Sequence, residues 1–102
     1  MELVKVKKLT IVAEALLEAK LVAALKERGI RGFSIIECQG EGSRGVRASE
    51  WEGRNVKIET LLDPEKAQSV LAWLAQRFFE TYSVIAYCQD VEVVRGNKFL
   101  GG

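Results

Sequence analysis

The chain has 102 residues, of which 48% are hydrophobic and 28% are charged, and its formal net charge is +1. This length and composition predict one globular domain with a single core, not a disordered chain. The near-zero net charge argues against a general nucleic-acid binder, and the absence of histidine excludes Ser–His and Cys–His catalysis and histidine-based zinc sites.

The first third of the chain predicts a strand, a helix and a second strand. Residues 8–13 alternate between apolar and polar side chains and end in small ones, as a strand does. Leucine and alanine recur at helical spacing over residues 15–28, and Gly29 follows where a C-terminal glycine cap is expected. Residues 33–38 form a second apolar run of strand length.

The second half of the chain predicts another strand, helix and strand. Residues 55–62 alternate cleanly between apolar and polar positions, which is typical of a strand. Asp63 and Pro64 provide a capping carboxylate and a proline at the first helical position, so a helix is expected from there to about Glu80. A last strand is expected over residues 82–88, and it continues or restarts over residues 91–94.

This order, βαβ, a long loop and then βαβ, is the ferredoxin-like α+β pattern in one domain that spans residues 1–102. Two helices cover only one face of a four-stranded antiparallel sheet, yet apolar residues stand next to each other in the strands, as at Ile35 and Ile36. We therefore expect other copies of the chain to cover the second face, most simply in a closed homotrimer. Trp73, which lies off the apolar stripe of its helix, is either at the core rim or a subunit contact.

A long stretch without periodicity, residues 40–54, separates the second and third strands. Structureless loops of about 15 residues are uncommon in small domains and are usually functional or disordered. Glycines such as Gly40 and Gly42 let backbone N–H groups converge, while Ser43, Arg44 and Arg47 supply donors that suit phosphate. The stretch is thus either an anion site or a merely solvated loop, and it lacks the GK[ST] of a Walker motif.

The second half of this loop places Glu50 and Glu52 on either side of Trp51. Tryptophan is enriched at interface hot spots, so Trp51 is either a docking anchor for a partner or a side chain that packs on its own subunit. The two glutamates are interpreted as solvated loop charges, not as an acid–base pair. No catalytic residue is nominated, and we expect a protein that is not an enzyme.

Cys38 and Cys88 lie in apolar, strand-like segments and outside any C-x-x-C motif, so they are interpreted as buried, reduced thiols. A disulfide or a redox switch is the alternative. The sequence shows neither a signal peptide nor an apolar run of the roughly 18–20 residues that cross a membrane. A cytoplasmic protein is expected.

Five segments, in their order and spacing, resemble the PII-like signalling proteins, and among these the SbtB type and the carboxysome-associated branch. They are KLTIVAE, GIRGFSIIE, GEGSRGVR, NVKIE and EVVRGNKF, which together extend from residue 8 to residue 99. The resemblance implies a ferredoxin-like homotrimer with adenine nucleotides (AMP, ADP, ATP or cyclic AMP) in the clefts between subunits. It also implies that residues 40–54 are the T-loop, which changes order with the ligand and docks on a target.

Matching positions imply a nucleotide site without metal, and its residues are Gly40, Gly42, Ser43, Arg44, Arg47 and Gly96. In the T-loop, Glu50 and Trp51 would meet the partner, which by resemblance is a membrane bicarbonate transporter or a carboxysome-related protein. The protein would then sit peripherally at the inner membrane, and bicarbonate is a second ligand in the carboxysome-associated relatives. The chain ends without the cysteine-bracketed tail of the SbtB type, so no redox-controlled nucleotide hydrolysis is expected.

Three other readings are weaker on the same residues. A CutA-like trimer shares the fold but is associated with metal ions, and the chain has no histidine and no cysteine pair at ligand spacing. A ferredoxin-like RNA-binding module needs aromatic residues on its central strands, and residues 56–59 have none. A PII-like regulator of another transporter is the third alternative.

Overall fold

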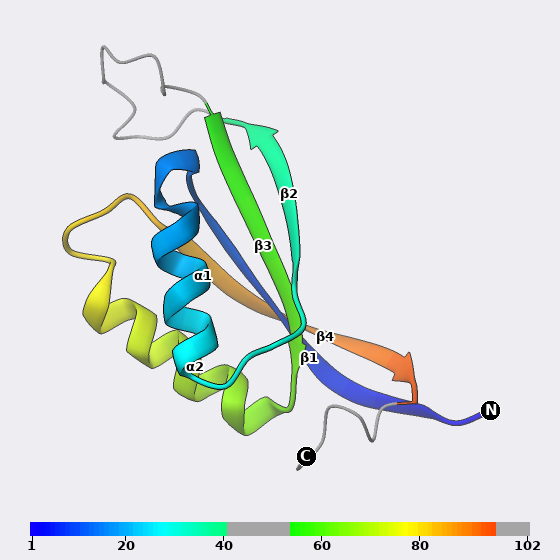
Figure 1. Ribbon diagram of the computed structural model, residues 1–102. Coiled ribbons are helices and arrows are strands. Elements are labelled where there is room, and N and C mark those ends of the chain that lie inside the picture. The colour runs from blue at the N-terminus through cyan, green and yellow to red at the C-terminus, as the bar shows by residue number, and fades with distance from the viewer. Residues whose placement is uncertain (41–53, 96–102) are drawn as a thin grey trace.

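The computed structural model describes residues 1–40 and 54–95 (Figure 1). Its elements in chain order are β1 (Leu3–Glu14), the 3-10 turn η1 (Ala15–Leu17), α1 (Glu18–Glu27), β2 (Ser34–Gln39), β3 (Arg54–Leu62), α2 (Pro64–Arg77) and β4 (Ile85–Val94). Leaving the short turn aside, this is the predicted order βαββαβ. The α+β class is therefore confirmed.

The strands of the described residues form one sheet in the order β2-β3-β1-β4, and every neighbouring pair is antiparallel. One row across the sheet shows the register, because Ile58 of β3 pairs with both Ile35 of β2 and Ile11 of β1, and Ile11 pairs with Ala86 of β4. The β1 strand is thus inserted between β3 and β4, which is the split βαβ arrangement.

The side chains on one face of the sheet form the core with both helices. In β1 the core positions alternate through Leu9, Ile11 and Ala13, as expected for a strand with one covered face. The same cluster also contains residues of η1, α1 and α2 and the residue that follows α2, which are Leu17, Leu21, Ala24, Leu25, Ala67, Val70, Leu74 and Phe78. Burial of one such aliphatic side chain stabilises a fold by roughly 1.5–3 kcal/mol, so this layer holds the two helices on the sheet.

The ends of the helices follow the residues that the sequence provides. Asp63 caps α2 as predicted, since its Oδ1 accepts a hydrogen bond of 2.9 Å from the backbone N–H of Lys66. Gly29 has a φ of 85°, the left-handed conformation expected after a helix. The other two bounds were wrong: the first helix begins as a 3-10 turn, and α2 ends at Arg77, three residues before Glu80.

The first and last strands differ from the prediction. β1 begins at Leu3, not at residue 8, and β4 runs without a break from Ile85 to Val94. Both differences have one cause, because residues 3–12 of β1 pair with the whole of β4, from Leu3 opposite Val94 to Val12 opposite Ile85. The residues from 82 to 84 are not strand, and the Tyr82 N–H instead bonds back to the Phe78 carbonyl.

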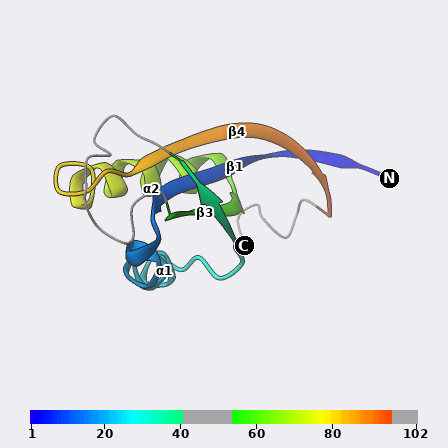
Figure 2. The same ribbon diagram turned by 90° about the horizontal axis from the view of Figure 1, so that it is seen from above.

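Beyond the helices, β1 and β4 continue as a two-stranded ribbon, which lengthens the molecule to 50 × 25 × 20 Å (Figures 1 and 2). Residues 3–6 of β1 pair only with β4, whereas Lys7 also faces Leu62 of β3. The two cysteines are free thiols, as predicted, but both are half-buried and not fully buried. No helix within the described residues is long and apolar enough to cross a membrane.

Candidate functional site

The predicted site begins where β2 ends and β3 starts. Cys38 pairs with Asn55, and Gln39, the last residue of β2, pairs with Arg54, the first residue of β3. Both ends of the long stretch between these strands therefore leave the same end of the sheet (Figure 1). Residues paired in an antiparallel ladder lie about 5 Å apart, so the base of the predicted T-loop is narrow and fixed.

Gly40 is the one proposed nucleotide-binding residue that the structure describes. A Cβ atom built at Gly40 would lie 3.1 Å from Nδ2 of Asn55, a distance at which the amide must move. The site thus has little room at its base, and Asn55 sets that limit. The remaining predicted site residues lie outside the described residues, and they are Gly42, Ser43, Arg44, Arg47, Glu50, Trp51 and Gly96.

A row of side chains crosses the face of the sheet that carries no helix. It passes through Lys57, two residues along β3 from Asn55 at the loop base. In register, Lys57 of β3 pairs with Ile36 of β2 and with Val12 of β1, and Val12 pairs with Ile85 of β4. Ile36 is 43% exposed and Ile85 is 60% exposed. The loop base therefore borders an apolar surface that can receive a flat ring or another copy of the chain.

The next row on this helix-free face contains a buried polar atom without a partner. Thr10 pairs with Glu59 on one side and with Tyr87 on the other, and its side chain is fully buried. Among the described residues, its Oγ1 is the buried side-chain atom that makes no hydrogen bond. Lys8 reaches over the neighbouring strand, with its Nζ 3.7 Å from a carboxylate oxygen of Glu59. Unpaired buried hydroxyls are uncommon, so Thr10 adds a desolvation cost to this face.

The two parts of the predicted site stand at opposite ends of β1. Glu14 pairs with Asn55 at the loop base, while Leu3 pairs with Val94 at the other end of the 12-residue strand. A strand rises about 3.3 Å per residue, so these ends are about 35 Å apart. Arg95, which precedes Gly96 in the sequence, follows Val94 directly and has a left-handed φ of 60°. A single copy of the chain therefore does not bring Gly40 together with the end of β4.

The titratable groups with displaced pKa values lie along β1 and β4, away from the loop base. A hydrogen bond and an ion pair of 2.6 Å between Lys7 Nζ and Asp90 Oδ1 lower the pKa of Asp90 and raise that of Lys7. Burial raises the pKa of the Cys88 thiol, which favours its protonated form. Within the described ranges, no group of three His, Cys, Asp or Glu side chains could hold a metal ion.

Comparison with known proteins identifies the family. Residues 6–98 match the family model described as nitrogen regulatory protein P-II. The chain belongs to the P-II family. It is similar to a PII-like signaling protein from Thermus thermophilus, with 47% identity and a TM-score of 0.82, over 98% of this chain and 100% of the other.

Solved structures of CPII from Thiomonas intermedia also match. The form bound to ADP and bicarbonate is 27% identical with a TM-score of 0.80, over 96% of this chain and 97% of CPII. The form bound to ADP, AMP and acetate is 25% identical with a TM-score of 0.79, over 97% of this chain and 98% of CPII. The expected PII-like family and fold are thus confirmed, while the narrower SbtB and carboxysome branch stays a prediction.

Sequence reasoning missed two features of this P-II chain that bear on the site. The strand pattern places Asn55 at the start of a strand and does not indicate that its amide limits the space at Gly40. Thr10 fits the alternating pattern of the first strand, and no sequence signal marks its hydroxyl as unpaired. Both features depend on which residues of neighbouring strands face each other, and only the register of the folded sheet shows these pairs.

Proposed function

We propose that this protein is a non-enzymatic sensor of adenine nucleotides, and that residues 40–54 are the T-loop through which it signals. One observation carries the proposal: a chain of the P-II family aligns over nearly its full length with CPII, whose structures hold ADP, AMP and bicarbonate. The chemistry of the loop agrees with that ligand class, because it combines glycines, a serine and arginines without a catalytic group.

The phosphates are held at the loop base by Gly40, Gly42, Ser43, Arg44 and Arg47. A charge-assisted hydrogen bond contributes about 1.5–3 kcal/mol, so two arginine forks and a few backbone amides suffice for the roughly −8 kcal/mol of a micromolar complex. The paired ends of the loop at Gln39 and Arg54 reduce the entropy that ligand binding must overcome.

The adenine site is shared between copies of the chain. Gly96 is assigned to the adenine by resemblance, and the residue before it lies about 35 Å along the sheet from the loop base, so a neighbouring copy must supply it. The exposed Ile36, Ile85 and Tyr87 on the helix-free face give such a copy an apolar surface. A closed homotrimer completes the site and covers the apolar surface at once. Each copy then contributes its loop base to one site and the end of its β4 to the next.

The signal leaves through the T-loop. A bound phosphate captures Arg44 and Arg47 and shifts the loop population toward one that a partner recognises, with Glu50 and Trp51 at the contact. The partner is a membrane bicarbonate transporter or a carboxysome-related protein, so nucleotide and bicarbonate levels together regulate inorganic-carbon uptake. The bicarbonate bound to CPII supports this second ligand.

Isothermal titration calorimetry tests the proposal. AMP, ADP, ATP and cyclic AMP are titrated into the native protein, each with and without bicarbonate, and at least one adenylate is expected to bind. The variant R44A/R47A is expected to lose this binding while its mass by light scattering stays that of the native assembly. R31A removes an exposed arginine remote from the loop and serves as the matched control. Unchanged affinity in R44A/R47A overturns the phosphate role, and a native protein that binds no adenylate overturns the function.

A further inference from the structure

A cluster of two arginines and a tryptophan lies on the helix layer, and nucleotide sensing does not use it. The guanidinium of Arg28 lies 5.2 Å from the ring centroid of Trp73, and that of Arg77 lies 5.4 Å from it. Arg28 follows the last residue of α1, whereas Trp73 and Arg77 belong to α2. We call these three residues the arginine–tryptophan patch.

The patch is held in place by a ring contact with the core and by a hydrogen bond to α2. Phe78, which is buried in the core, meets the Trp73 ring edge-on at a centroid distance of 6.3 Å. Arg28 donates a hydrogen bond of 2.7 Å from Nη2 to Oγ of Ser69, one helical turn before Trp73. Ser69, Trp73 and Arg77 follow each other at intervals of four residues and so share one side of α2. The guanidinium of Arg28 is thereby positioned by a hydrogen bond and a ring, and that of Arg77 by the ring.

The charges of the patch are not compensated within the described residues. The ion pairs found there join Lys7 to Asp90 and Lys8 to Glu59, so no carboxylate lies at ion-pair distance from Arg28 or Arg77. A guanidinium stacked on an aromatic ring can still donate from its edge to a planar acceptor, and Arg28 uses only one of its N–H groups, on Nη2, for Ser69. The structure thus presents two pre-positioned forks of the kind that bind carboxylates in pairs of hydrogen bonds.

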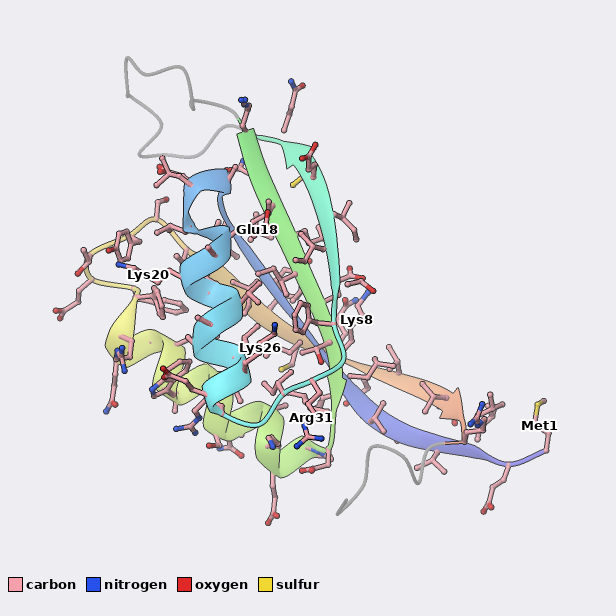
Figure 3. The ribbon with its side chains drawn as sticks, in the orientation of Figure 1. Met1, Lys8, Glu18, Lys20, Lys26 and Arg31 are labelled. Atoms are coloured by element: carbon pink, nitrogen blue, oxygen red, sulfur yellow. The ribbon has the colours of Figure 1, made fainter. Side chains whose placement is uncertain are left out.

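A third cation extends the positive surface along the helix layer. Lys20 of α1 projects toward the segment after α2 (Figure 3), where its Nζ lies 3.0 Å from the hydroxyl of Tyr82 and 5.3 Å from the ring centroid. The Tyr82 ring in turn contacts Phe78, with 5.9 Å between centroids. Cations and aromatic rings therefore alternate across the two helices and the segment that follows them.

We propose that the arginine–tryptophan patch docks an acidic segment of a partner protein, whose Asp or Glu carboxylates bind Arg28 and Arg77. Charge complementarity selects this occupant, since the patch offers forked donors without acids of its own. Nucleic acids and anionic membranes are recognised by many cations at once, and a net charge of +1 gives the chain no general attraction to them. The patch lies on the helix layer, away from the sheet face that the proposed trimer covers, so assembly leaves it open.

The single tryptophan of the patch provides the readout. The sequence has two tryptophans, so W51F leaves Trp73 as the only one. A synthetic peptide of eight glutamates, titrated into W51F at low ionic strength, is expected to change the Trp73 emission in a saturable way that added salt reverses. R28Q and R77Q in the same background are each expected to weaken binding by about tenfold or more, because each loses a charge-assisted fork. K26Q removes an exposed lysine of α1 outside the patch and is expected to leave the affinity unchanged.

Other outcomes overturn the proposal. Absence of a saturable change, an equal loss in K26Q and R28Q, or an equal response to a peptide of eight lysines removes the patch as an acidic-segment site. Tighter binding of an eight-nucleotide oligothymidylate with the same arginine dependence makes it a nucleic-acid surface instead. Circular dichroism checks the fold of both variants, and the exposed Arg77 carries the test if R28Q unfolds. Adenylate affinity is expected to stay native in both variants, so failure here and failure of the nucleotide proposal remain distinct.

Discussion

Gln39 and Arg54 are paired across the end of the sheet, although residues 40–53 separate them in the sequence. The entropy cost of bringing two paired residues together grows only slowly with the number of residues between them, so the length of this segment can vary at little cost to the sheet. The residues at its base have no such freedom, because they belong to the β2–β3 ladder. The loop base is therefore where changes of sequence affect both stability and ligand binding.

The first prediction concerns Gly40 and Asn55. In G40A the new methyl group meets Nδ2 of Asn55 at 3.1 Å, so the amide has to move and the free energy of unfolding is expected to fall by about 1 kcal/mol. N55A removes the obstacle, and G40A in that background is expected to cost much less. Urea unfolding of the four proteins at one protein concentration measures the coupling. Simple additivity of the two substitutions would mean that the contact does not matter.

Sequence patterns predicted the parts of this fold that local chemistry specifies. Asp63 and Gly29 bound helices as expected, because a cap and a left-handed glycine are properties of single residues. The start of β1, residues 3–7, was missed because its charges look like loop chemistry, whereas the continuation of the last strand over residues 91–94 was expected. Lys7 and Asp90 are strand residues only because each faces the other across the ladder, and that partner is invisible in either segment alone.

The candidate site shows the same division. The glycine and arginine content of the loop and the family resemblance were visible in the sequence, and the family was confirmed. The separation between the loop base and Arg95 was not visible, because it depends on the register that sets Asn55 opposite Glu14 and Val94 opposite Leu3. That separation is also the physical reason to place the nucleotide between copies.

The second prediction compares two buried threonines of the same sheet. The hydroxyl of Thr60 donates a hydrogen bond of 2.6 Å to the Gly32 carbonyl, whereas that of Thr10 has no partner among the described residues. T60V is expected to lower the free energy of unfolding by about 1 kcal/mol, while T10V is expected to leave it unchanged or to raise it. Urea unfolding at a fixed protein concentration measures both. An equal loss in T10V would show that the Thr10 hydroxyl is hydrogen-bonded in the assembled protein.

The third prediction concerns the ion pair of the ribbon. The pKa of Asp90 is lowered by its bond to Lys7, so the contribution of Asp90 to stability is present at neutral pH and lost as the pH falls through that lowered pKa. The raised pKa of Lys7 means the converse at alkaline pH, where stability is lost as the pH rises through it. D90N is therefore expected to melt slightly below the native protein at pH 7 and level with it at a pH below the lowered pKa of Asp90.

Glu92 offers the control for this pH dependence. It lies on the same strand opposite Lys5, yet among the described residues its carboxylate makes no ion pair. E92Q removes the same charge from the same ribbon and is expected to leave the difference in melting temperature between pH 7 and low pH close to native. If D90N and E92Q behave alike, general charge repulsion and not the Lys7 contact explains the effect.

The fourth prediction links assembly to ligand binding through Ile85. This side chain is 60% exposed at the edge of the helix-free face, where the proposed homotrimer would trap a charge against a neighbouring copy. I85E is expected to shift the protein from the mass of a trimer to that of a monomer in light scattering. Because the loop base and the end of β4 stand about 35 Å apart in one copy, the monomer is also expected to lose adenylate binding in calorimetry.

Phe79 provides a matched control, since it is also an exposed apolar residue but follows the end of α2. F79E introduces the same charge outside the helix-free face, so both the trimer and the adenylate affinity are expected to survive. An I85E monomer that still binds the nucleotide with native affinity would place the whole site within one chain. Because the register of β1 keeps the end of β4 away from the loop base, that site would then consist of the loop alone, without the end of β4.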